Sequence, residues 1–193
     1  MSGTIDQQLC LPRLPNLTLM ILTIFTIFHV AISLVGLLAG YVTVFGLLRG
    51  KFFSGWTATF LAMTVATSVT GFFFPRNHIM PAHIVGIVSL LGLAVAIYAL
   101  YSRKLLGAWR NVYVVSAVFS LYLNMFVAVV QAFQKIPVLK AAAPTQSEPP
   151  FVVAQIVVMV LFIAAGWRAW VRFREFHLES SVVIAPPSVV ARF

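Results

Sequence analysis

The sequence predicts an all-α integral membrane bundle of five transmembrane helices. Of the 193 residues, 61% are hydrophobic and only 9% are charged. Soluble domains average about 45–50% apolar and about 25% charged residues, so a water-soluble fold of this size could not bury so much apolar surface. Several apolar runs also reach the length of about 20 residues that a helix needs to cross a bilayer.

Five apolar runs predict the five spans. The first is longer than a bilayer core of about 30 Å requires, so it must tilt or extend beyond the membrane. It also exceeds the roughly 7–15 apolar residues of a signal peptide, so we expect an uncleaved helix. We expect an outer N-terminal segment over 1–16, a transmembrane domain over 17–172 and a cytoplasmic tail without a clear helical period over 173–193. The predicted spans are residues 17–48, 56–74, 81–101, 112–133 and 151–171.

The Lys and Arg residues predict the orientation of these spans. Nine of the 13 flank one set of span ends and four flank the other. Basic residues are enriched on the cytoplasmic side, which predicts an N-terminus outside and a C-terminus in the cytoplasm. A net charge of +9 in a soluble protein would suggest nucleic acid, but these bases lie beside apolar runs and no motif supports that partner. The nine are Arg49, Lys51, Arg103, Lys104, Arg110, Arg168, Arg172, Arg174 and Arg192.

The few polar residues of the spans form stripes, because positions three, four and seven apart share one helix face. Small and hydroxylated residues allow close helix approach in a membrane, so packing accounts for most of the stripes. Gly36 and Gly40 form one such close-packing pair. The stripes comprise Thr26, His29, Ser33, Gly36, Gly40 and Thr43; Thr57, Thr64, Thr67, Ser68 and Gly71; and Tyr113, Ser116, Ser120, Asn124, Gln131 and Gln134.

Some polar residues predict a ligand pocket open to the outer side. A polar group in hydrocarbon needs a partner, since leaving it unpaired costs a few kcal/mol. Ionisable groups within a membrane are therefore functional candidates, although a histidine bonded to a neighbouring Asn or Tyr is an equally good account of His29. The candidate pocket residues are His29, His83, Asn124, Gln131 and Gln155.

Two ligands suit this pocket. His29 and His83 could supply two axial nitrogens to haem b. A quinone could instead be held by His29 with the amides of Asn124 and Gln131. We expect no metal site, because no His and carboxylate spacing places ligands on one helix face. The cofactor otherwise stays unknown.

Glu148 and Arg76 predict an ion pair on the outer surface. Glu148 directly precedes the last span, where the helix N-terminal dipole favours a carboxylate. Arg76 lies in the neighbouring outer connection and is its expected partner.

The runs Thr70–Pro75, Leu121–Asn124 and Ala143–Pro150 resemble a family of small, uncharacterised bacterial inner-membrane proteins with five helices. The resemblance covers roughly residues 20–173. It implies a compact helical bundle in a bacterial inner (plasma) membrane, and it brings no activity, cofactor or site assignment.

No acid lies within a span and no serine or threonine lies in a nucleophile motif, so the sequence favours a protein without catalytic residues. The leading hypothesis is an accessory subunit whose partners are the lipid bilayer and other membrane subunits. The alternatives are the haem- or quinone-binding bundle and a small channel or transporter.

Overall fold

A computed structural model describes residues 14–74 and 81–184, with the side chains of 17–74 and 83–173, and it is helical with no strand in these ranges. The prediction of an all-α bundle is therefore confirmed. The helices are α1 Leu14–Leu48, α2 Ser54–Gly71, α3 Pro81–Ile97, α4 Trp109–Lys135, α5 Pro137–Ala142 and α6 Pro149–Ile184, with a π-helical turn, η1, over Tyr98–Ser102.

Four of these helices are long and apolar enough to cross a membrane: α1, α3 with η1, α4 and α6. Their lengths and composition are those of a multi-pass membrane protein. The helix α2 differs because five threonines and two serines lower the hydropathy of its 18 residues.

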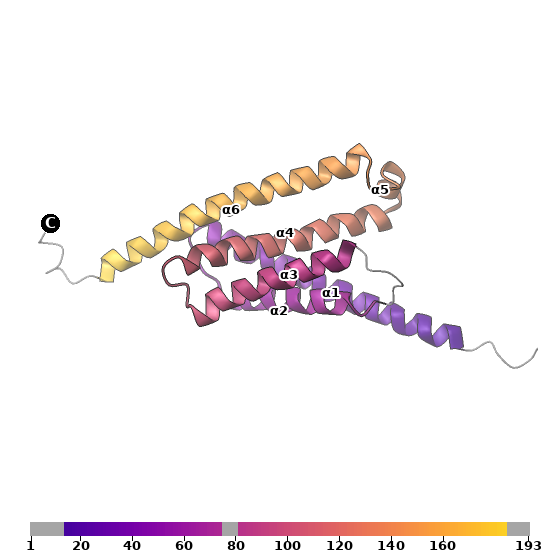
Figure 1. Ribbon diagram of the computed structural model, residues 1–193, viewed down its shortest axis with the longest axis horizontal. Helices are drawn as coiled ribbons and strands as arrows, with labels where there is room; N and C mark the ends of the chain where they lie inside the picture. The colour runs from indigo at the N-terminus through magenta and orange to yellow at the C-terminus, as the bar shows by residue number, and fades with distance from the viewer. Residues whose placement is uncertain (1–13, 75–80, 185–193) are drawn as a thin grey trace, which may run out of the picture.

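The first four helices form a ring (Figure 1). Neighbours around the ring are α1 and α2, α2 and α3, α3 and α4, and α4 and α1. The helices α2 and α4 therefore lie diagonally across the centre. The last helix, α6, lies outside this ring against α4 and α1. The N-terminal part of α1 projects beyond the bundle at one end and the C-terminal part of α6 beyond it at the other.

Small residues let the ring helices approach closely. A Cβ on Gly36 would lie 3.3 Å from Cβ of Met63 in α2. A Cβ on Gly40 would lie 2.5 Å from Cδ1 of Leu121 in α4. A Cβ on Gly92 of α3 would lie 3.0 Å from the Ser120 hydroxyl. These contacts support the packing interpretation of the stripes at these positions.

One end of the bundle, called the basic end below, carries Arg49, Lys51, Arg103, Lys104 and Arg110. The chain turns there from α1 to α2 and from η1 to α4. Both turns use glycines in the left-handed region, Gly50 at φ 67° and Gly107 at φ 53°, where a Cβ would be strained.

Two helix boundaries differ from the prediction. The segment 134–150, expected to be an outer loop, contains α5, which begins at Pro137, because proline is well suited to the first helical turn. The last helix was expected to end at Val171, but it continues to Ile184. Phe173, placed in the tail by the prediction, is only 1% exposed and lies against Phe52. This aromatic contact anchors α6 two residues past the predicted end of the span.

Candidate functional site

His29 is paired with the neighbouring helix. Its Nδ1 lies 2.8 Å from the Thr70 hydroxyl oxygen of α2, and its ring meets the Phe74 ring edge-on at 5.1 Å. The Thr70 hydroxyl also lies 2.7 Å from the Ala66 carbonyl oxygen. The imidazole tautomer decides which of His29 and Thr70 donates to the other. A partner was expected, but it is a threonine rather than Asn or Tyr.

His83 contacts a different part of the α2 C-terminus. Its ring lies 5.7 Å from the Phe72 ring, whereas His29 contacts Thr70 and Phe74. Each histidine thus packs on its own side chains of this segment.

The glutamines at the other side of the bundle bind backbone carbonyls of α4. Gln155 of α6 donates to the carbonyl oxygen of Phe126 at 3.3 Å, and Gln146 donates to that of Val130 at 3.3 Å. These carbonyls are one turn apart, so the two amides hold the start of α6 and the preceding loop against α4. Gln131, by contrast, is exposed. Gln155 is therefore explained in part by packing.

A set of buried polar atoms lies on the two diagonal helices and has no hydrogen-bond partner in the described structure. Successive members are three, four or seven residues apart, so each helix presents them on one face. The Tyr113 and Thr57 side chains interact, so α2 and α4 approach each other at this pair. We call this set the diagonal polar cluster; it comprises Thr57, Thr64 and Thr67 of α2 and Tyr113, Ser120 and Asn124 of α4.

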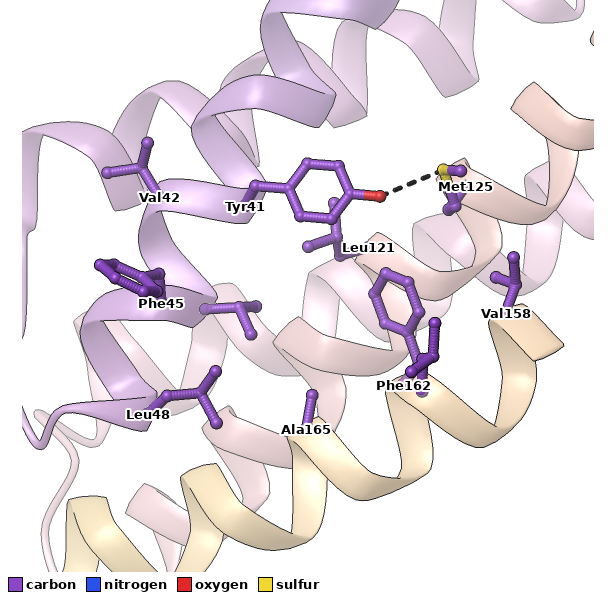
Figure 2. A pocket seen from close by; sticks show the side chains of 11 residues that line it. Tyr41, Val42, Phe45, Leu48, Leu121, Met125, Val158, Phe162 and Ala165 are labelled. Carbon is purple, nitrogen blue, oxygen red and sulfur yellow. Dashed lines mark hydrogen bonds between the residues drawn. The ribbon is translucent and has the colours of Figure 1, made fainter.

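An open apolar groove lies elsewhere among the described residues, between α1, α4 and α6 (Figure 2). It has a volume of about 520 Å³ and an almost wholly apolar lining. The Tyr41 hydroxyl points to the Met125 sulfur, 3.2 Å away, and so presents little polarity to the groove. None of the five predicted pocket residues lines it. The lining is Tyr41, Val42, Val44, Phe45, Leu48, Leu121, Met125, Val158, Leu161, Phe162 and Ala165.

Sequence reasoning missed this groove because its lining looks like any other apolar span. No sequence pattern indicates the groove, because its volume depends on the distances between three helices. The described residues also contain no group of three or more His, Cys, Asp or Glu side chains able to hold a metal ion.

Glu148 binds its own loop. Its carboxylate accepts hydrogen bonds from the Thr145 backbone N–H at 3.0 Å and hydroxyl at 2.9 Å, and from the Ser147 N–H at 3.1 Å. These donors, the Thr145 N–H first, hold the pKa of the Glu148 carboxyl below its ordinary value. The proposed partner, Arg76, lies outside the described residues.

Acidification is expected to release this loop. The Glu148 pKa is lowered by folding, so its stabilising effect is complete above the ordinary pKa of 4.5 and is lost as the pH falls through the lower folded-state pKa. The amide proton signals of Thr145 and Ser147, followed by NMR during an acid titration, should shift with a midpoint below 4.5. Glu148→Gln should abolish that transition. A midpoint at or above the ordinary value would contradict the assignment.

Comparisons with known proteins give no relative: no family description, curated protein or solved structure matches this chain.

Proposed function

We propose that the chain is a five-span protein of the bacterial plasma membrane that serves as a non-catalytic accessory subunit of a larger membrane complex. Its N-terminus lies outside and its C-terminus lies in the cytoplasm. The proposal rests on the surface of α6, and the number and direction of the spans rest on α2 and the basic end.

The packing of α2 supports a fifth span. With 18 residues it is about 27 Å long, close to the bilayer core of about 30 Å. It lies between α1 and α3 in the ring, and Thr57 and Thr64 are each 1% exposed. The hydroxyls of Thr57 and Thr64 are thus shielded from lipid, which lowers the cost of placing this helix in a membrane.

The basic end supports the orientation. Arg49, Lys51, Arg103, Lys104 and Arg110 all lie where α1 and η1 end and where α2 and α4 begin. Basic residues of short loops stay on the cytoplasmic side during insertion. The basic end is then cytoplasmic, and Glu148 with α5 lies outside.

The helix α6 has one face on the bundle and one face without a partner. Its bundle face includes Gln155, Phe162 and Ala169. The opposite face is apolar and open: Trp167 is 70% exposed and Val160 is 55% exposed. We call this face the outward stripe; it comprises Val153, Val157, Val160, Trp167 and Val171.

This open helix is the observation that carries the proposal. In the most apolar 18-residue window of α6 no residue is buried, whereas 44% are buried in that of α4. Because α6 buries so little of its own surface in the bundle, most of its apolar surface is available to another membrane protein. Contacts between such helices depend on close packing, which the short Val side chains and intervening Ala164 permit.

Photo-crosslinking tests the proposal. A benzoylphenylalanine at Val160 is expected to give one discrete protein adduct in native membranes. The matched control is Ile87 of α3, which is 52% exposed and so should meet lipid alone. The adduct should co-migrate with the intact protein in a complex on a native gel.

If Val160 and Ile87 both give no protein adduct, and if the protein extracted in mild detergent migrates as a monomer, the accessory-subunit proposal is wrong.

A further inference from the structure

The groove between α1, α4 and α6 is open on the side between α1 and α6. Gly166 brings α6 close to α4, since a Cβ there would lie 3.4 Å from Cγ1 of Val118. On the α1 side, Phe45 and Leu48 lie across the groove from Ala165 and Phe162 of α6 (Figure 2). The volume of about 520 Å³ falls within the range of about 300–1,000 Å³ typical of ligand sites.

The apolar lining selects for a chain of methylene groups. Tyr41, whose hydroxyl points at the Met125 sulfur, is the one lining residue with a polar side-chain group. A ligand with polar groups along its length would lose its hydrogen bonds in this groove. An acyl chain loses none and gains close contacts.

Cations lie at one end of the groove. The Arg49 guanidinium sits over the ring of the groove residue Phe45, 4.0 Å from its centre. Arg168 is exposed and follows Leu161 by seven residues, so it extends from the same face of α6 one turn past Ala165. Arg49 belongs to the basic end, and Arg168 lies three residues beyond Ala165, which lines the groove near Leu48.

No described carboxylate neutralises these cations. Glu148 is the one acid whose side chain the structure describes, and it precedes α6 at the opposite end. A ligand that fills the groove and ends at Arg49 and Arg168 therefore has an apolar chain and an anionic head.

We propose that this groove binds one acyl chain of an anionic phospholipid, with the phosphate held by Arg49 and Arg168. Basic residues near a membrane surface attract anionic lipids by about 1 kcal/mol each. A neutral isoprenoid quinone would fill the apolar space but leave both arginines without an anion. The bound chain would fill the space between α1 and α6 and so hold α6 on the ring. The inference goes beyond the accessory-subunit proposal and does not depend on it.

Lipid binding to the full-length protein, delipidated in detergent, tests the proposal. Native mass spectrometry with dioleoyl phosphatidylglycerol is expected to show one retained lipid, with dioleoyl phosphatidylcholine retained much less. Arg49→Gln should weaken phosphatidylglycerol retention by about fivefold, the loss expected for one cation. Lys104→Gln, a cation in the turn after η1, is the matched control and should change nothing.

Ala165→Phe tests the apolar half of the site. A phenyl ring there should fill the groove and abolish retention of the lipid. Ala164→Phe makes the same substitution on the exposed face one residue away and should leave retention unchanged. If Ala165→Phe does not fold, the difference in phosphatidylglycerol retention between Arg49→Gln and Lys104→Gln still tests the proposal.

Three results overturn the proposal. One is equal retention of the two lipids, together with equal retention by Arg49→Gln and Lys104→Gln. Another is a quinone as the molecule that extraction recovers from the purified protein. The third is a dimer that Ala165→Phe dissociates, which would assign the groove to a second copy of the chain.

Discussion

Gly40→Leu is expected to prevent the ring of α1 to α4 from forming. A Cβ at this position would already lie 2.5 Å from Cδ1 of Leu121 and 2.8 Å from Cδ2 of Phe60. Both neighbours are completely buried; Leu121 borders the groove, so the Phe60 ring is the neighbour that leaves the added side chain least room. Overpacking by even a few atoms costs about 1–3 kcal/mol, and leucine adds three carbons beyond that Cβ. Thermal unfolding in detergent and the yield of monodisperse protein measure the effect.

Two variants make this experiment specific. Gly55→Leu inserts the same side chain into α2 where nothing lies within 4 Å, so it should be tolerated. Phe60→Ala should partly rescue Gly40→Ala, because residues in direct contact do not have additive effects on stability. Gly40→Leu protein with wild-type stability would contradict the close approach of α1 to α2 and α4.

Phe173→Ala is expected to release the end of α6 that lies at the basic end. The Phe173 ring is 1% exposed, and it lies 6.5 Å from the Phe52 ring, which in turn lies 6.2 Å from the Tyr113 ring. Truncating a buried phenylalanine costs about 3–5 kcal/mol through lost contacts and the cavity left behind. The midpoint of thermal unfolding should fall, and protease should cleave the C-terminal part of α6 faster.

Trp167→Ala is the control for this experiment. It removes a larger ring from the same helix, but that ring is 70% exposed, so little packing is lost. Equal destabilisation by the two variants would show that Phe173 does not anchor α6.

The helices could be predicted from the sequence because hydrocarbon leaves few alternatives. A long apolar run must satisfy its backbone internally, and a helix does so. The predicted span 17–48 accordingly falls within α1, Leu14–Leu48. The burial of Phe173 could not be predicted in the same way, because its ring packs on Phe52, more than 100 residues away in the chain. The short helix α5 was not predicted, because its segment has the composition of a loop.

The candidate site was only partly predictable. A partner for His29 could be expected, because an imidazole between apolar helices needs one. Thr70 was not foreseen as that partner, since threonines in membrane helices commonly bond their own carbonyls, as Thr70 does with Ala66. The groove could not be predicted at all. Its volume depends on the distances between three helices, and the identity of apolar residues does not reveal those distances.

The threonines of α2 have a consequence for the order of assembly. Unlike α1, α3 with η1, α4 and α6, this helix does not reach the apolarity of a membrane span by itself, and the hydroxyls of Thr57, Thr64 and Thr67 are buried inside the bundle. It therefore partitions poorly into lipid by itself during synthesis, whereas α1 partitions readily. If α2 is the fifth span, as proposed above, we expect it to enter the bilayer together with α1 as a helical hairpin, because the contact between these two helices is the most extensive in the bundle. The later helices are then expected to assemble on that hairpin.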